Sequence, residues 1–485
     1  MQLYNTKTRQ KEDFTPREPG KVAMYVCGIT AYDYCHIGHA RAAVVFDVLV
    51  RYLRFLDYEV CFVRNFTDVD DKIINKASEE GLSSSEVAQK YIAAFYEDMD
   101  KLNVLRADIE PKATEHIQDM IALTEKLLSK GYAYETESGD VYFKVRSFNE
   151  YGRLSGSNIE ELRSGARIAP GEEKQDALDF ALWKHAKPDE PYWPSPWGNG
   201  RPGWHLECSA MSERYLGLPM DIHGGGQDLA FPHHENERAQ SVAAAGKEFV
   251  RYWIHNGFVK VNEEKMSKSL GNFVTLRDIF KYYLPESLRF FLISQHYRSP
   301  LDFSWEALDE AEKGLKRIYQ TKMQIEDVLA RNKWSTEDLP AEFDAEIKDL
   351  VGNWTQSMND DLNTAAALGH TFKLVRLANR ILEDKTWRKS EQARDIFKKK
   401  KKKMHAWGAI LGVFNAKSTQ FLEDLRNRKA VRKGIDVQKA LELIEDRQKA
   451  RQEKDFARAD SIRDELHEMH IEVKDTPQGP VWDVL

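Results

Sequence analysis

The sequence is poor in cysteine and lacks long apolar runs. Four cysteines, at positions 27, 35, 61 and 208, occur in 485 residues, and no two of them form a CxxC pair. So few thiols exclude a disulfide scaffold, and we expect a reducing, cytoplasmic setting in which a thiolate can serve as a metal ligand. No stretch approaches the roughly 20 apolar residues of a membrane span. The start, MQLYNTKTRQKEDF, has charges where a signal peptide has an apolar core, so we expect neither membrane insertion nor export.

An excess of positive charge is also absent overall. The chain has 71 Lys/Arg against 78 Asp/Glu, a net charge of −7, which argues mildly against a nucleic-acid partner. The average hides an asymmetry, because residues 386–440 contain 16 Lys/Arg and 5 Asp/Glu. A basic region on an acidic protein is a plausible RNA-facing surface. A solvated helix face is the alternative, and charge alone favours that interpretation.

The first strong pattern is a short apolar run at 21–28 (KVAMYVCG) that ends at a glycine, as in a strand buried on both faces of a parallel sheet. From 38 to 56 apolar side chains recur at helical spacing, and a second apolar run, EVCFVR, follows at 59–64. Strand, helix and strand in this order predict a βαβ unit, hence an α/β fold with a parallel sheet. Ligands bind such sheets at the carboxyl ends of the strands, where Cys27 and residues 65–71 should lie.

The character of the sequence changes along the chain. Strand-like pieces, polar loops and a segment rich in proline and tryptophan predict an insertion at about 115–203 within a sheet domain that spans 1–300. Apolar residues at three- and four-residue spacing then predict a helical bundle over 301–415. A small domain over 416–485 ends in a predicted hairpin with its turn near 477–479. We expect the six lysines of 398–403 to lie on a solvated helix face or in a loop.

The motif His36-Ile37-Gly38-His39 follows the first predicted strand and opens the first helix. Gly38 lets a bound group approach the backbone closely. The two histidines are three apart and share a face at the helix N-terminus, which favours anions. Two imidazole donors there could stabilise the charge that develops on a phosphate. The four-residue pattern carries little information alone, and its position between strand and helix adds most of its weight.

Residues 265–269 (KMSKS) follow a strand-like segment. Lys265 and Lys268, separated by small or flexible residues that include Ser267, predict a mobile cationic loop that closes over a triphosphate and neutralises the leaving pyrophosphate. An ordinary polar loop is the alternative for this pentapeptide alone. The two motifs together, in this order on an α/β sheet, resemble the class I aminoacyl-tRNA synthetases. The chemistry of that class, attack of an amino-acid carboxylate on the α-phosphate of ATP, depends mostly on positioning and charge stabilisation.

A second group of residues has the chemistry of a zinc site. Cys27 stands at a strand end, Cys208 lies in WHLECS, and His233 and Glu237 lie four apart in FPHHENE, where they would point the same way from one helix. Two thiolates, an imidazole and a carboxylate are a credible zinc set. The HExxH protease pattern is absent. Small buried cysteines and a helix-surface pair are the alternative, and the long separations of the four residues favour it when spacing alone is considered.

The resemblance becomes specific over most of the chain. Five segments, in the family's order, resemble the cysteinyl-tRNA synthetases: YVCGITAYDYCHIGHARAAVVFD, RNFTDVDDKII, GWHLECSAMS, DIHGGGQDLAFPHHENERAQ and KMSKSLGNF. The tail segment KARQEKDFARADSIRDEL resembles the same family. The resemblance implies a Rossmann-like catalytic domain with an insertion, a helical bundle and a small anticodon-binding domain. It implies one zinc ion per chain that binds the substrate thiolate, with matching ligands at Cys27, Cys208, His233 and Glu237.

A metal site answers a physical problem. Cysteine and serine differ only by sulfur for oxygen, and a pocket that measures shape discriminates such near-isosteres weakly, on the order of a hundredfold. A thiol of pKa about 8.5 ionises readily near a metal, whereas an alcohol stays protonated and binds zinc poorly. Direct coordination therefore turns a small difference in size into a large difference in chemistry. Such a site would make a separate editing domain unnecessary.

Other residues are assigned on weaker grounds, with local packing as the alternative. We expect Gly224, Gly225 and Gly226 to bring the backbone close to the nucleotide. Gly28, Thr67, Trp204, His223 and Asp228 are expected around the amino-acid substrate, with Asp228 accepting from its ammonium group. Asp68, Asp70 and Asp71 should cap the next helix, and magnesium should arrive with ATP. Cys35 and Cys61 should be buried and inert, Cys61 in the core.

The expected reaction is a two-step ligation. L-cysteine and ATP give cysteinyl-adenylate, and the cysteinyl group passes to the terminal adenosine of tRNA(Cys). We expect His36, His39, Lys265 and Lys268 to stabilise phosphate charge, and the bundle and tail of a monomer to bind the tRNA. One rival is a ligase that passes the activated cysteine to a small amine. Another is a non-catalytic RNA-binding protein with a structural zinc.

Overall fold

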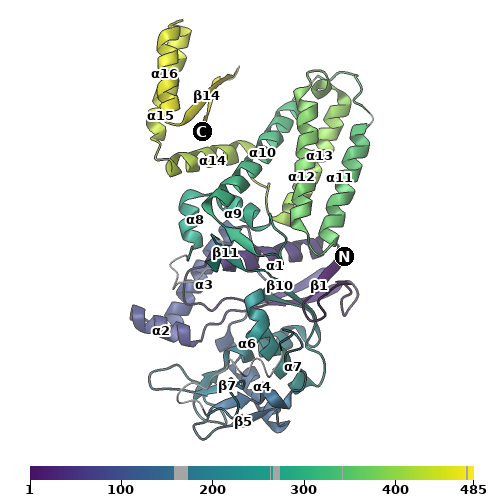
Figure 1. Ribbon diagram of the computed structural model, residues 1–485, viewed down its shortest axis with the longest axis vertical. Helices are drawn as coiled ribbons and strands as arrows, with labels where there is room; N and C mark the ends of the chain where they lie inside the picture. Colours follow the sequence, from purple (N-terminus) through teal and green to yellow (C-terminus); the bar gives the residue numbers. More distant parts are fainter. Residues whose placement is uncertain (158–172, 263, 266–272, 332, 341, 477–478) are drawn as a thin grey trace.

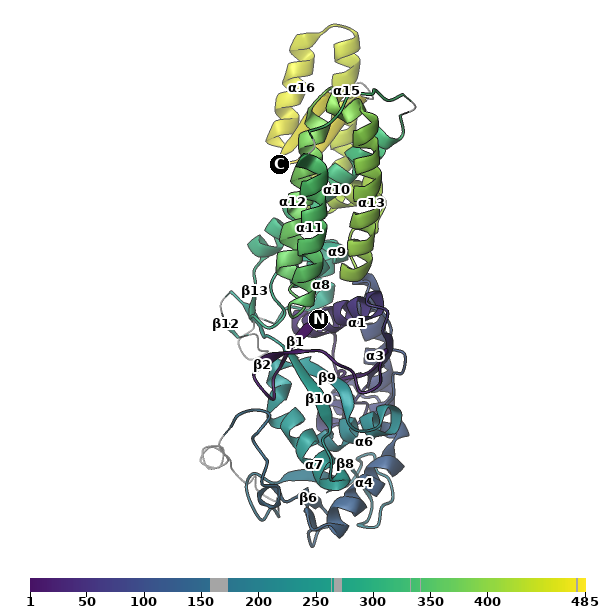
Figure 2. The same ribbon diagram turned by 90° about the vertical axis from the view of Figure 1, so that its right-hand side faces the viewer.

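The computed structural model describes residues 1–157, 173–262, 264–265, 273–331, 333–340, 342–476 and 479–485. The molecule is elongated, with the insertion at one end, a parallel sheet in the middle, and the helical bundle and C-terminal unit at the other end (Figures 1 and 2). No helix among the described residues is long and apolar enough to cross a membrane.

The central sheet has the strand order β10-β9-β3-β4, and every pair in it is parallel. Its strands are β3 (Lys21–Val26), β4 (Glu59–Arg64), β9 (Met220–Gly226) and β10 (Val250–Asn256). Helix α1 (Ile37–Phe55) connects β3 to β4, which confirms the predicted βαβ unit. The apolar runs form strands because helices cover both faces of the sheet, so every second side chain is buried on either side. The predicted α/β fold is confirmed.

Two hydrophobic cores lie on opposite faces of this sheet. Met24 and Val26 face a core that continues through α1 into the helical bundle, whereas Tyr25 faces a core shared with the insertion, α6 (Trp204–Leu216) and α7 (Glu235–Ala245). The alternation along β3 follows from the two-residue period of a strand. The sheet is thus held from both sides, and its carboxyl edge is a rigid platform.

The insertion contains an antiparallel sheet of order β5-β6-β7-β8. Its strands are β5 (Ala133–Glu135), β6 (Val141–Phe143), β7 (Phe180–His185) and β8 (Gly200–Pro202). The segment between β4 and this sheet is mainly helical: α2 (Asp71–Glu80), α3 (Ser84–Lys101), a 3-10 turn at Ala113–Glu115 and α4 (Ile117–Ser129). A further 3-10 turn occupies Val145–Ser147.

Smaller elements flank the central sheet. An N-terminal hairpin of β1 (Gln2–Asn5) and β2 (Gln10–Asp13) packs on β10. A 3-10 turn at Gln227–Leu229 and a π-helical segment at Ala230–His234 lead into α7. A three-stranded sheet joins β11 (Val259–Val261) to β12 (Glu264–Lys265) and β13 (Leu301–Phe303), and α8 (Leu276–Tyr282) and α9 (Pro285–Leu292) precede the bundle.

The bundle contains α10 (Trp305–Leu329), α11 (Glu342–Asn359), α12 (Thr364–Glu383) and α13 (Glu391–Leu411), with a 3-10 turn at Trp387–Lys389. The lysine run lies in α13, where all of its members except Lys400 are exposed. Lys400 is 1% exposed, its ammonium group contacts the Leu374 carbonyl, and burial lowers its pKa well below the usual value. The run is therefore a solvated helix face with one buried member.

The C-terminal unit follows α14 (Ser418–Arg432) and has its own small core. It consists of α15 (Val437–Gln452), α16 (Phe456–Glu468) and an antiparallel hairpin of β14 (Ile471–Thr476) and β15 (Gly479–Val484). The predicted hairpin is confirmed, and residues 477–478 of its predicted turn lie outside the described residues.

Candidate active site and metal centre

The site lies at the carboxyl edge of the central sheet, between β3 and β9. These two strands are neighbours in space, but β3 continues to β4 on one side and β9 continues to β10 on the other. Such a change of direction opens a crevice at the strand ends, where ligands of α/β sheets bind. Cys27 follows β3 directly, and the histidine–glycine segment ends β9.

The four predicted metal ligands converge on this crevice, with all four ligand atoms within 4.8 Å of one another. The Cys27 Sγ atom lies 3.5 Å from Cys208 Sγ and 3.5 Å from Glu237 Oε1. The His233 Nε2 atom lies 3.0 Å from the same carboxylate oxygen. Cys208 is on α6, Glu237 on α7 and His233 just before α7. Helix α6 packs against both β3 and α7, which brings the set together.

Burial and mutual charge shift the pKa values of these groups strongly. Burial raises the pKa of Cys27 well above its usual value. Burial also acts to raise that of Cys208, but the Cys27 hydrogen bond and His233 outweigh it and bring its pKa to about 6. For His233, burial is outweighed by Glu237 and Cys208, which raise its pKa to about 10. Against burial, His223 and His233 hold the pKa of Glu237 well below its usual range.

The cluster fits a zinc ion. Zinc bonds of about 2.0–2.3 Å in tetrahedral geometry put ligand atoms about 3.3–3.8 Å apart, close to the separations of Cys27 from Cys208 and Glu237. Glu237 is 0% exposed, and within the described residues its Oε2 atom makes no hydrogen bond, although the His223 Nε2 atom lies 3.4 Å from it. A buried carboxylate with a spare lone pair is costly unless a cation or donor completes it. Two thiols, an imidazole and a carboxylate are a donor set that zinc accepts.

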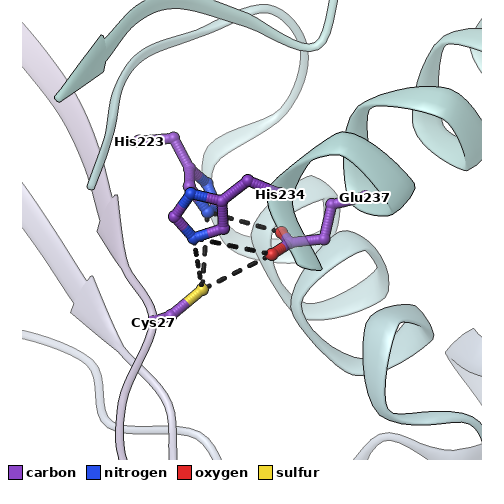
Figure 3. Close-up of side chains that lie close together, drawn as sticks. All are labelled: Cys27, His223, His234 and Glu237. Carbon is purple, nitrogen blue, oxygen red and sulfur yellow. Dashed lines mark hydrogen bonds and ion pairs between the residues drawn. The ribbon is translucent and has the colours of Figure 1, made fainter. Parts of the chain in front are cut away.

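A second set of four overlaps the first. The Nε2 atoms of His223 and His234 lie 3.5 Å and 3.3 Å from Cys27 Sγ, and His223 Nε2 lies 3.4 Å from Glu237 Oε2 (Figure 3). The two sets share Cys27 and Glu237. The geometry alone thus allows two sets of four metal ligands, one with Cys208 and His233 and one with His223 and His234. The hydrogen bonds made by the ring nitrogens that would not bind the metal distinguish the two sets.

The HIGH histidines form a stacked pair at the start of α1. His36 is the N-cap, and its Nδ1 atom accepts a hydrogen bond from the Gly38 backbone N–H at 3.0 Å. The rings of His36 and His39 are 3.7 Å apart at an interplanar angle of 24°. The predicted shared face therefore exists, and an accepting Nδ1 leaves the proton of a neutral His36 on Nε2.

The KMSKS segment is described only at its flanks. The backbone of Lys265 pairs with Lys260 of β11, whereas Ser267 and Lys268 lie outside the described residues. On the far side, the Phe273 ring meets His36 edge-on at 5.0 Å, and the backbone of Thr275 bridges that of His36. The chain thus leaves the loop directly beside the HIGH motif.

The glycines of the site allow close internal packing. A Cβ at Gly28 would lie 1.6 Å from the Asn65 carbonyl oxygen, so any larger residue would push apart the ends of β3 and β4. A Cβ at Gly224 would meet the Phe46 ring at 2.3 Å, and one at Gly225 would meet His234 at 2.9 Å. Of the glycine run, only Gly226 is partly exposed. Protein side chains thus occupy the space beside Gly224 and Gly225.

Four other predicted substrate residues lie in the same parts of the chain. Trp204 is 38% exposed and stacks on His233 at a ring distance of 4.1 Å, so one face of the indole backs the metal cluster. The Thr67 hydroxyl donates to buried Glu207 at 2.5 Å, and burial raises the pKa of Glu207 well above its usual value. Asp228 is exposed at the end of β9. His223 is fully buried beside the ligands.

Two lesser predictions need correction. Cys35 is buried as predicted, but Cys61 is exposed, because β4 is the edge strand and its side chains at 59 and 61 face solvent. Of the three aspartates, Asp70 alone caps α2, through the Lys72 N–H at 2.9 Å. Asp68 accepts from Thr114, and Asp71 forms ion pairs with Lys184 and Arg201 of the insertion. Asp68 and Asp71 therefore bind partners far away in the sequence instead of capping α2.

The histidines at 205, 234 and 255 were not predicted. His205 Nδ1 lies 2.9 Å from His233 Nδ1, and His234 Nδ1 lies 2.8 Å from His255 Nε2. Burial lowers the pKa of all three, that of His255 to about 3. Only their positions could have indicated a role at the site: His255 stands at the carboxyl end of β10, and His205 and His234 lie near predicted ligands in the sequence.

Three family models match the chain. The model described as "tRNA synthetases class I (C) catalytic domain" matches residues 13–313, the "DALR domain" matches 353–415, and the "Cysteinyl-tRNA ligase anticodon binding domain" matches 438–482. These matches follow the order of sheet domain, bundle and C-terminal unit in the structure.

Curated relatives match over the full length. The cysteine–tRNA ligases of Maridesulfovibrio salexigens and Lawsonia intracellularis are 64% and 53% identical to this chain over 485 residues, which is 100% of both chains in each case. That of Oleidesulfovibrio alaskensis is 63% identical over 484 residues, again covering 100% of both chains.

Solved structures share the fold at low identity. The Mycobacterium tuberculosis methionyl-tRNA synthetase in complex with methionyl-adenylate has a TM-score of 0.60 at 16% identity, over 81% of this chain and 89% of that one. The LeuRS–tRNA–LeuAMS ternary complex of Agrobacterium radiobacter K84 has a TM-score of 0.58 at 11% identity, over 84% and 87%. The fold is that of the class I aminoacyl-tRNA synthetases. Within that class, the chain belongs to the cysteine–tRNA ligase family.

Proposed function

We propose that the chain activates L-cysteine with ATP to cysteinyl-adenylate and transfers the cysteinyl group to the terminal adenosine of tRNA(Cys). As a member of the family it is an aminoacyl-tRNA synthetase. One observation carries the amino-acid specificity: ligand atoms of Cys27, Cys208, His233 and Glu237, drawn from three distant parts of the chain, lie within 4.8 Å of one another. When bound there, zinc would supply a direct metal–sulfur bond to the substrate thiolate, which serine cannot form.

Hydrogen bonding favours this ligand set over the alternative with His223 and His234. A histidine that ligates through Nε2 carries its proton on Nδ1 and almost always donates it to a partner. The Nδ1 atom of His223 is buried and has no hydrogen-bond partner within the described residues. Ligation by His223 would therefore leave a buried N–H unpaired, at a cost of about 1–3 kcal/mol. The Nδ1 atom of His233, in contrast, has His205 as its partner.

We assign His223 instead to the support of the ligands. With its proton on Nε2, it faces Glu237 Oε2 at 3.4 Å and Cys27 Sγ at 3.5 Å, and its bare Nδ1 needs no acceptor. Trp204, stacked on His233, then forms a wall of the amino-acid pocket. Gly28, Thr67 and Asp228 complete the proposed surroundings of the substrate, Asp228 as the acceptor for its ammonium group.

Phosphate chemistry is assigned to the two signature motifs. His36 and His39, stacked at the N-terminus of α1, donate to the phosphates of ATP where the helix dipole also favours negative charge. Gly38 and the partly exposed Gly226 bring the backbone near the nucleotide, whereas Gly224 and Gly225 pack against Phe46 and His234 behind it. ATP brings its magnesium ion. Lys265, Ser267 and Lys268 close on the pyrophosphate. The chain enters this loop from β12 and leaves it beside His36, which supports that role.

The remaining domains are assigned to tRNA. The bundle over 301–415 would contact the tRNA stem, and the unit over 416–485 would bind the anticodon, with phosphate contacts from the basic residues of 386–440. A ligase that uses a small amine has no need of these regions, and a non-catalytic RNA-binding protein has no need of HIGH and KMSKS. Charging of tRNA(Cys) and cysteine-dependent ATP–pyrophosphate exchange separate the three possibilities.

The test combines exchange with metal removal. We expect exchange with cysteine to be lost after chelation and restored by zinc, and exchange with serine to be negligible throughout. Lys268→Ala should slow adenylate formation by roughly 100-fold, since it removes a charge that stabilises the transition state. Its metal content should stay unchanged. Lys260→Ala, an exposed lysine in neighbouring β11, is the matched control. Equal loss of metal and activity in Lys268→Ala would indicate misfolding and contradict the assigned role.

A further inference from the structure

A chain of hydrogen bonds connects the N-terminal hairpin to the metal cluster. The Thr6 hydroxyl lies 2.7 Å from His255 Nδ1, and His255 Nε2 lies 2.8 Å from His234 Nδ1. His234 Nε2 then lies 3.3 Å from Cys27 Sγ, and Figure 3 shows this imidazole edge directed at the sulfur. His234 is 0% and His255 is 7% exposed, whereas Thr6 lies at the partly exposed turn of the hairpin.

Thr6 is held in place by the edge of the central sheet. Its backbone N–H donates to the Trp253 carbonyl at 2.9 Å. The neighbouring Asn5 side chain donates to the Arg251 carbonyl at 2.9 Å and accepts from the Trp253 N–H at 3.1 Å. The hairpin is thus docked on β10 two residues before His255, and the Thr6 hydroxyl has a defined position.

The hydrogen bonds of this series all run in one direction when Cys27 is a metal-bound thiolate, a condition that rests on the proposed function. A thiolate can only accept, so His234 must donate from Nε2 and is left with a bare Nδ1. His255 must then donate from Nε2 to that nitrogen, which leaves its own Nδ1 bare. Thr6 must donate to His255 Nδ1. Each group determines the proton position of the next, and Thr6 is the terminal donor.

We propose that Thr6 and His255 are positioning residues of the metal centre, which hold the His234 ring so that its Nε2–H donates to Cys27. Without the Thr6 hydroxyl, the Nδ1 atom of His255 loses its hydrogen bond. The His255 ring is then held less firmly, and the donor that it offers to His234 Nδ1 is less well placed. The hairpin therefore supports the metal centre through these two histidines.

The test uses the full chain loaded with Co²⁺ as a spectroscopic substitute for zinc. Thr6→Val should weaken metal affinity by about 10–100-fold, as changes in groups that orient metal ligands typically do. It should also shift the sulfur-to-cobalt charge-transfer band, since the His234 N–H that donates to Cys27 becomes less well placed. Thr6→Ser, which retains a hydroxyl, should restore both. Thr8→Val is the matched control, because the Thr8 hydroxyl donates to Glu12 in the same hairpin and takes no part in the hydrogen bonds that lead to Cys27.

A second background separates an effect of Thr6 that passes through His255 from simple loss of hairpin docking. In His255→Gln, the amide can donate to His234 without help from Thr6, so adding Thr6→Val should change neither affinity nor the band any further. An additional loss in the double variant would overturn the proposal in favour of a purely structural role. A wild-type spectrum and affinity in Thr6→Val would also overturn it. Failure of the wild-type chain to bind metal at all would instead contradict the proposed function.

Discussion

Two buried charged clusters in this molecule differ in whether their polar groups find all their hydrogen-bond partners within the protein. At the junction of the sheet domain and the bundle, Arg289 is 1% exposed, and its guanidinium donates to the carbonyls of Leu411, Leu102 and Asn103 at 2.8–2.9 Å and pairs with Asp47. In the metal cluster, a carboxylate, two thiols and several imidazoles crowd together, and one oxygen of Glu237 makes no hydrogen bond among the described residues beyond the 3.4 Å approach of His223 Nε2.

The difference indicates what each cluster is for. Asp47 also accepts from Arg51 and from the Leu105 backbone N–H, so both of its carboxylate oxygens have donors at the junction without any ligand. The metal cluster has an excess of lone pairs, and a cation is the group that would balance it. We therefore regard the Arg289 cluster as a structural joint and the Cys27–Glu237 cluster as a site built for an ion. The variants below test that distinction.

The largest effect is expected from Cys208→Ala. Loss of one thiolate should reduce bound zinc from one per chain to a small fraction. It should also lower cysteine activation by more than the roughly 10–100-fold that changes around a metal's ligands cost. Metal analysis and exchange assays measure the two losses. Cys35→Ala, another buried cysteine outside the cluster, should keep its metal and activity. Equal effects of the two substitutions would contradict the assignment.

The next effect concerns the joint. Asp47→Ala leaves the Arg289 guanidinium buried without its carboxylate, which should cost about 3–5 kcal/mol of unfolding free energy. Denaturant unfolding measures this cost, and zinc content under native conditions should remain at the wild-type level. Glu97→Ala breaks an exposed ion pair with Arg277 and should cost less than about 1 kcal/mol. Loss of zinc in folded Asp47→Ala would show that the two clusters are not independent.

The smallest effect is expected in the C-terminal unit. The hydrogen bond from Arg447 lowers the pKa of Asp475, so the pair stabilises the unit at neutral pH and loses this contribution as pH falls through the lowered value. Asp475→Asn should cost about 1 kcal/mol or less at pH 7, because the carboxylate is 43% exposed. The difference from wild type should shrink below about pH 4. Hydrogen exchange of α15 and β14 in the full chain measures it, with exposed Asp464→Asn as control. A difference that grows on acidification would contradict the sign.

The sequence predicted much of the fold because its strongest signals are local. The runs at 21–28 and 59–64 are apolar enough to form strands wherever they lie, and the stripe of 38–56 forms α1 with boundaries within one residue. Cys61 was wrongly placed because composition does not show which strand is the edge of a sheet. The bonds of Asp68 and Asp71 were missed because their partners lie 46 to 130 residues away.

The candidate metal ligands were predictable from motifs, whereas the roles of the histidines around them depend on tertiary contacts. The family resemblance marks Cys27, Cys208, His233 and Glu237, but spacing alone does not show that α6 packs against both β3 and α7. His255 became relevant only through the parallel pairing of β9 and β10, and Thr6 only through docking of the hairpin. Such support depends on tertiary contacts that no local pattern encodes.

Zinc-edge X-ray absorption of the purified protein, with and without bound cysteine, tests the central claim most directly. We expect two sulfur atoms in the zinc shell of the free protein, from Cys27 and Cys208, and a third when cysteine binds, with no such change for serine. An unchanged sulfur count on cysteine binding, or a shell with a single sulfur and two imidazoles, would contradict the account.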